Sequence, residues 1–213
     1  MIVTDVETTG LDPVKNSIVS IGAVDFDHPE CQFYGECRIK EGSTIEAEAL
    51  QVNGFTIEQV TKTLPMSHND LMARFNGWYN SRTDRTLAGE NVPSFDLPML
   101  VEGLKAAGIQ TRLGHRAVDM HSVFFVHLLK LGVTPPLRDG RTALGADTIL
   151  IYAGLFTEPK PHNALTGAKM EAEAFNRLIY GKPLFTEFVS FPVPKVIQAS
   201  VMTVPLVKRE TYE

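Results

Sequence analysis

The chain has 213 residues, which suits one globular domain with or without an extension. Hydrophobic residues make up 44% and charged residues 21% of the sequence, so a disordered chain is excluded. The net charge of -5 excludes a broad cationic surface, so any binding of nucleic acid would depend on local contacts. Because no apolar run approaches the roughly 18 residues of a membrane span and the N-terminus lacks a signal peptide, we expect a cytoplasmic protein without a membrane partner.

The N-terminal third predicts three strands and a helix. The strands cover residues 2–6, 17–26 and 32–39, and their short joins favour antiparallel pairing, because a parallel crossover needs a dozen or more residues. Ser67 followed by Asp70 is typical of a helix start, and apolar residues continue at helical spacing through position 78.

An alternation of strands and helices follows. The pattern predicts short strands over residues 86–89 and 117–119, separated by a helix over 95–107. Further helices are expected over residues 122–131, 143–153 and 164–180, with a loop at 135–140. From residue 184 prolines punctuate a valine-rich stretch without helical periodicity. We therefore expect one domain over residues 1–183 and a tail over 184–213.

Two acidic residues end the first predicted strand, in Asp5-Val6-Glu7-Thr8-Thr9-Gly10. Alternate residues of a strand point to the same face, so the carboxylates of Asp5 and Glu7 lie together. Their repulsion favours a divalent cation between them, and hard oxygen ligands suit Mg²⁺ or Mn²⁺. From these six residues alone, a strand end followed by an ordinary polar turn is an equal alternative.

Two later segments add to this candidate site. Asp96 follows the predicted strand over residues 86–89 and begins a helix, so it could face the same sheet edge as Asp5. His162 precedes the helix over residues 164–180, a suitable place for a general base, although a lone histidine is usually structural. A third carboxylate would complete a metal site, with His162 as a candidate general base.

Three segments of the chain resemble the motifs of the DnaQ-like, DEDDh-type 3′–5′ exonucleases. They are Asp5-Val6-Glu7-Thr8-Thr9-Gly10, Asn91-Val92-Pro93-Ser94-Phe95-Asp96 and His162-Asn163-Ala164-Leu165. The resemblance runs from residue 1 to about 182. It implies an α/β, ribonuclease H-like fold, with a mixed five-stranded sheet flanked by helices, and two-metal hydrolysis of phosphodiester bonds.

The resemblance also implies roles for single residues. Asp5, Glu7 and Asp96 would hold two Mg²⁺ or Mn²⁺ ions, and His162 would take the proton of the attacking water. Positions that contact the terminal nucleotide in the family are matched by Thr8, Thr9, Leu11, Asn91 and Phe95. The implied substrate is a 3′ end of single-stranded or frayed DNA, with RNA as an alternative, in proofreading or repair.

The chain departs from the family pattern at position 167, where Gly167 replaces the fourth metal-binding aspartate. One explanation is a catalytically impaired relative that still binds nucleic acid. A second is relocation to Glu171, one helical turn further on the same face, unless Glu171 is simply solvated. A third is reduced activity with a single metal ion. A phosphatase with Asp5 as nucleophile fits less well, because it predicts aspartate at position 7.

The tail suggests a macromolecular partner. Polymerase-associated relatives dock through C-terminal extensions, and Gln198-Ala199-Ser200-Val201-Met202 weakly resembles a sliding-clamp-binding peptide. The resemblance thus allows a DNA polymerase or a sliding clamp as partner. Alternatively, Phe185, Phe188 and Phe191 fold back over the domain and the rest of the tail pairs as a strand.

Overall fold

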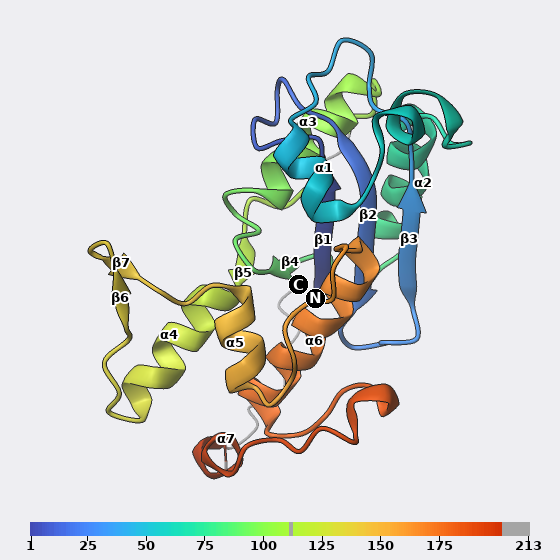
Figure 1. The fold of residues 1–213 in the computed structure, drawn as a ribbon. Coiled ribbons are helices and arrows are strands. Elements are labelled where there is room, and N and C mark those ends of the chain that lie inside the picture. The colour runs from blue at the N-terminus through green and yellow to red at the C-terminus, as the bar shows by residue number, and fades with distance from the viewer. Residues whose placement is uncertain (111–112, 202–213) are drawn as a thin grey trace.

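A five-stranded sheet forms the centre of the computed structural model, which describes residues 1–110 and 113–201 (Figure 1). Its order is β3-β2-β1-β4-β5. The strands are β1 (Ile2–Thr8), β2 (Ile18–Asp25), β3 (Gln32–Glu36), β4 (Leu87–Gly89) and β5 (Ala117–Asp119). The first three strands pair antiparallel. Strand β4 pairs parallel with β1, and β5 pairs parallel with β4, so the predicted mixed sheet is confirmed.

Helices cover both faces of this sheet. The described residues form α1 (Ala47–Asn53), α2 (His68–Asn80), α3 (Asp96–Ala106), α4 (Met120–Lys130), α5 (Ala146–Tyr152), α6 (Ala164–Tyr180) and α7 (Lys195–Val201). Helix α6 crosses β1 and β2 on one face, whereas α2 and α3 lie on the other (Figure 1). None of the helices in the described part of the chain is both long and apolar enough to span a membrane.

The alternation of side chains along β1 divides the core into two apolar clusters. Val3 packs with residues of α4, α5 and α6, whereas Ile2 packs with residues of α2 and α3. Since Asp5 and Glu7 are two and four residues beyond Val3, they share its face. The strand therefore directs both carboxylates toward α6.

Gly22 in β2 allows α6 to approach the sheet closely. A Cβ atom at position 22 would lie 2.1 Å from the carbonyl oxygen of Ala164, the first residue of α6. Gly22 is also the residue of β2 that pairs with Asp5 in β1. The start of α6 is thus held directly against the strand pair that carries Asp5.

The first part of the tail packs on the domain. Phe185 and Phe188 are buried in the cluster on the α6 side, whereas Phe191 is 36% exposed. Glu173 and Arg177 of α6 form a fully buried ion pair, with 2.6 Å between Oε1 and Nε. The pair holds the tail, because Glu173 accepts the N–H groups of 184 and 185 and Arg177 donates to the carbonyls of 153, 188 and 191.

Several predicted elements need correction. The tail contains α7 instead of a strand, and Ile197 of this helix is buried. Residues 202–213, including Met202 of the clamp-like segment, lie outside the described residues. The loop expected at 135–140 includes β6 (Leu137–Arg138), which forms a hairpin with β7 (Arg141–Thr142) just after it. Helix α1 and the π-helical turn Gln59–Thr63 had no counterpart in the sequence analysis.

Candidate metal centre

Asp96 joins the carboxylates of β1 through a backbone contact. It is the first residue of α3, and its Oδ1 accepts the N–H of Val6 at 3.1 Å. Val6 lies between Asp5 and Glu7 in sequence, so this bond fixes the start of α3 beside both carboxylates. The predicted meeting of Asp96 with the end of β1 is confirmed, and Asp96 is only 3% exposed.

Glu171 of α6 belongs to the same acidic cluster. It is 8% exposed, and its Oε2 accepts the N–H of Glu90, just after β4, at 3.2 Å. Its negative charge is the strongest single charge acting on Asp5, ahead of Asp96 and Glu7. The alternative that Glu171 is a solvated surface residue is therefore wrong.

Gly167 faces Asp5 across the contact between α6 and β1. A Cβ atom at position 167 would lie 2.1 Å from Oδ2 of Asp5 and 3.2 Å from Oε1 of Glu158. The volume that a side chain would occupy here is thus already shared by two carboxylates. A side chain at this position would require the carboxylates of Asp5 and Glu158 to move from where they lie.

The Gly167→Ala variant is expected to lose Mn²⁺ affinity at least about 10-fold, because the methyl group must displace the carboxylate of Asp5. Its fold should persist, since alanine favours a helix over glycine by about 1 kcal/mol. Isothermal titration calorimetry with Mn²⁺ measures the change. Gly77→Ala in α2 is the matched control, because nothing lies within 4 Å of a Cβ there; equal Mn²⁺ affinities for both variants would contradict the expectation.

Glu158 is a site residue that the sequence analysis missed. It lies in the loop between α5 and α6, four residues before His162, and its Oε2 is 3.4 Å from Nδ1 of His162. Ligand atoms of Glu7, Glu158 and His162 all lie within 4.8 Å of one another. His162 therefore reaches the cluster as predicted, but together with a carboxylate that no motif identified.

Burial and mutual repulsion raise the pKa values of the clustered carboxyl groups. Burial is the main cause in each case, and it raises the pKa of Glu7 to about 7 and that of Asp96 to about 8. The pKa values of Asp5 and Glu171 rise well above the ordinary range for the same reason, with neighbouring carboxylates adding to the effect. Within residues 1–110 and 113–201, no lysine or arginine forms an ion pair with any of these four groups.

The metal-free protein is expected to lose stability as pH rises from about 5 to 8. The folded state holds protons on these groups more tightly than the unfolded chain, so the free energy of unfolding falls across this window. The pKa change of Glu7 from 4.5 to about 7 alone corresponds to roughly 3 kcal/mol. Urea unfolding in EDTA at several pH values measures the slope, which Mn²⁺ should reduce; unfolding free energies that stay constant or rise up to pH 8 would contradict the expectation.

The residues present fit a site for divalent cations. The donors are carboxylate oxygens, which suit Mg²⁺ and Mn²⁺, and Oε1 of Glu158 is buried without a hydrogen-bond partner in the described residues. Four clustered carboxylates that pair with no lysine or arginine in the described part of the chain are unfavourable unless they are protonated or bind a cation. A divalent cation bound here would supply the compensating positive charge.

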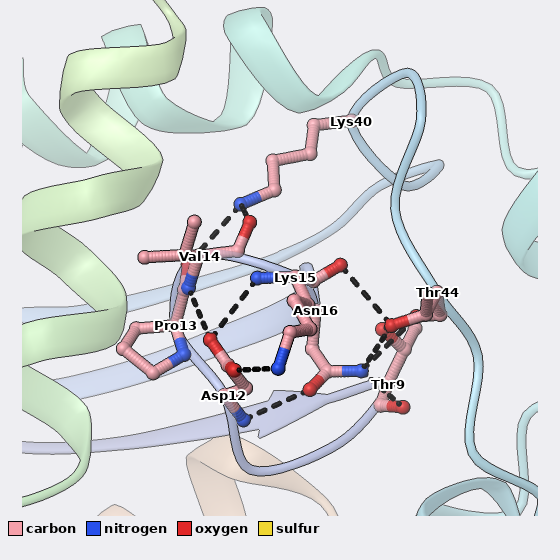
Figure 2. A network of polar contacts seen from close by, with 8 residues as sticks. All are labelled: Thr9, Asp12, Pro13, Val14, Lys15, Asn16, Lys40 and Thr44. Carbon is pink, nitrogen blue, oxygen red and sulfur yellow. Dashed lines mark hydrogen bonds and ion pairs between the residues drawn. The ribbon is translucent and has the colours of Figure 1, made fainter.

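The loop between β1 and β2 is fixed by a polar network, which Figure 2 shows. Asn16 donates to the carbonyl oxygens of Thr9 and Thr44, and its own Oδ1 accepts the N–H of Asp12. Lys40 donates to the carbonyl oxygens of residues 13 and 14. The network presents Leu11 to solvent on a rigid loop, at 75% exposure.

The residues matched to nucleotide-contacting positions differ in their surroundings. Thr9 is fully buried and its hydroxyl donates to Thr44, so Thr9 supports the loop instead of offering its side chain to a ligand. Thr8 is also buried, with its hydroxyl bonded to the carbonyl of Gly10. Leu11 and Asn91 are exposed, and Phe95 is half-buried before α3. Only these last three present side chains at the surface.

Comparison with known proteins places the chain among nucleases. The profile of the RNase_T family, described as exonuclease, matches residues 2–175. A comparison with curated protein sequences found no match.

Solved structures of exonuclease I share the fold. Escherichia coli exonuclease I in complex with a 5cy-dT13 oligonucleotide superposes with a TM-score of 0.64 at 15% identity, over 81% of this chain and 39% of that chain. Exonuclease I from Methylocaldum szegediense gives 0.63 at 18% identity, over 85% and 41%. A zinc-bound complex of the E. coli enzyme with single-stranded DNA gives 0.59 at 14% identity, over 80% and 38%. The chain therefore spans about two fifths of these enzymes.

Proposed function

Because the chain belongs to the RNase_T exonuclease family, we propose that it is a two-metal-dependent 3′–5′ exonuclease. It hydrolyses phosphodiester bonds at the 3′ ends of single-stranded or frayed DNA and releases nucleoside monophosphates. Single-stranded DNA is favoured over RNA because the similar exonuclease I structures contain DNA oligonucleotides. Proofreading or repair are the processes that need such an activity.

One observation carries this proposal. Asp5 and Glu7 of β1, Asp96 of α3 and Glu171 of α6 come from three separate segments. The fold brings half-buried Asp5 into one cluster with the buried Glu7, Asp96 and Glu171, and no lysine or arginine of the described residues pairs with them. Burying four like charges costs stability, so the cluster makes physical sense as a binding site for divalent cations. A purely structural role would be served better by apolar residues.

The roles of the residues follow from their positions. Asp5, Glu7, Asp96 and Glu171 hold Mg²⁺ or Mn²⁺, which when bound polarises the scissile phosphate and makes water more acidic. His162 accepts the proton of the attacking water. Leu11 on its rigid loop packs against the last base, and Asn91 and Phe95 line the place of the terminal nucleotide.

A catalytically impaired relative that binds nucleic acid is the second candidate. Gly167 favours it, because the family's fourth aspartate is missing from α6. Glu171 weighs against it, since a buried carboxylate one turn further on the same helix faces Asp5. The two candidates differ in turnover and not in binding.

A degradation assay distinguishes the candidates. Single-stranded DNA and RNA of one sequence, each labelled at the 5′ end, are incubated with the protein and Mg²⁺ or Mn²⁺. We expect a ladder of products shortened from the 3′ end, abolished by EDTA and by a 3′-phosphate on the substrate. Binding without shortening in either metal would favour the impaired relative, and shortening that persists in EDTA would refute the two-metal mechanism.

The C-terminal tail is the part of the chain considered for binding a protein partner, and its described residues include α7. We propose that a DNA polymerase or a sliding clamp binds the C-terminal tail, residues 184–213. Four residues of the clamp-like segment, 198–201, lie in α7, whose Ile197 is buried. Pull-down of a clamp by the full chain and by a chain ending at residue 201 tests this.

A further inference from the structure

Glu158 occupies the space that a fourth aspartate would otherwise use. Its Oε1 lies 3.2 Å from the position of a Cβ on Gly167, and Oδ2 of Asp5 lies 2.1 Å from the same point. Both oxygen atoms therefore border the space that a side chain at position 167 would occupy. A carboxylate is present at this place, although it comes from a different segment of the chain.

The immediate neighbours of Glu158 are metal-binding groups. One ligand atom each of Glu158, Glu7 and His162 lies within 4.8 Å of the other two. Glu7 is 7% exposed, and its carboxylate makes no hydrogen bond or ion pair in the described part of the chain. Oε1 of Glu158 is likewise buried without a hydrogen-bond partner. The carboxylate of Glu7 and Oε1 of Glu158 are thus buried oxygen donors that no protein group satisfies in the described residues, as a cation site requires.

The loop that carries Glu158 is anchored at its far end. The N–H of His162 donates to the carbonyl of Val52 in α1 at 3.0 Å. Asn163 caps α6 by accepting the N–H groups of residues 165 and 166, and it donates to the hydroxyl of Tyr34 in β3 at 2.7 Å. These bonds hold Glu158 and His162 against the end of β1, so their approach to Glu7 is built into the fold.

We propose that Glu158 supplies the metal ligand that Gly167 cannot, so that Glu7 and Glu158 share one divalent cation beside Asp5. The inference rests on the proposed function, because it assigns a ligand to the same centre. Oε1 of Glu158 would be the ligand atom, and Oε2 lies 3.4 Å from Nδ1 of His162. The carboxylate therefore orients the imidazole ring of His162. One residue thus replaces a ligand and positions the base.

Titration calorimetry with Mn²⁺ alone tests the inference without a measurement of activity. Glu158→Gln keeps the size of the side chain and removes the charge, and we expect it to weaken Mn²⁺ binding at least about 10-fold. Without metal its melting temperature should stay the same or rise, because one charge leaves the acidic cluster. Glu58→Gln makes the same change at an exposed position and should bind Mn²⁺ like the wild type. Asp5→Asn serves as the reference for a lost ligand.

The outcomes separate this inference from the proposed function. If Glu158→Gln binds Mn²⁺ like the wild type while Asp5→Asn does not, the inference is overturned and the metal centre stands. If Glu158→Gln lowers the melting temperature equally with and without Mn²⁺, Glu158 is only a structural partner of His162 and the inference is again overturned. A wild-type protein that fails to bind Mn²⁺ would overturn the proposed function itself.

Discussion

The Asp5→Asn variant is expected to shorten DNA on the order of 10³-fold more slowly than the wild type. Asp5 is central to the cluster, since Glu171, Asp96, Glu7 and Glu158 all act on its charge. Losing a residue that only orients a ligand costs about 10–100-fold, and a direct ligand contributes more. Single-turnover rates at saturating Mg²⁺ measure the loss.

The Asp5→Asn protein should nevertheless fold. Removing a buried, desolvated charge relieves repulsion, so the melting temperature without metal should not fall. Asp139→Asn provides the matched control, because Asp139 is exposed in the β6–β7 turn and asparagine accepts its φ of 51°. A rate for Asp5→Asn within 10-fold of this control would remove Asp5 from the catalytic assignment.

The Arg177→Met variant is expected to lose about 3–5 kcal/mol of unfolding free energy. Both Arg177 and Glu173 have fully buried side chains, so the substitution leaves the Glu173 carboxylate without its positive partner. It also removes the donors to three backbone carbonyls, two of them in the tail. Urea unfolding monitored by circular dichroism measures the loss.

A double variant isolates the charge effect of this pair. Glu173→Gln combined with Arg177→Met leaves an oxygen to accept the N–H groups of residues 184 and 185 but no buried charge. It should recover part of the stability lost in Arg177→Met. A loss below about 1 kcal/mol in Arg177→Met would show that the pair does not fasten the tail.

The sequence allowed prediction of the parts of the site that lie on regular elements. Alternation along a strand placed Asp5 and Glu7 on one face, and the start of a helix placed Asp96 beside them. Helical spacing connected position 167 with Glu171. These relations depend only on local geometry, so they could be derived without the tertiary fold.

Glu158 could not be found in the same way. It precedes α6 in a loop, where no periodicity relates one side chain to the next, and its position depends on contacts of the loop with α1 and β3. Pro159, next to Glu158, indicates only a turn. Helix α7 was missed as well, because it has only seven residues and the prolines near it favour turns. The β6–β7 hairpin did carry a usable signal, because Asp139-Gly140 is typical of a two-residue hairpin turn.

The spacing between the acidic groups of β1 and α6 depends on Gly22, a residue with no functional side chain. Its hydrogen atom is all that separates the backbone of β2 from the first turn of α6, and β2 holds Asp5 in register. A bulkier residue there would lift the whole helix, and every group that the helix contributes would retreat from the strand by the same amount. The separation between the acidic groups of β1 and α6 thus depends on a residue without a side chain, which lies next to Asp5 in the sheet.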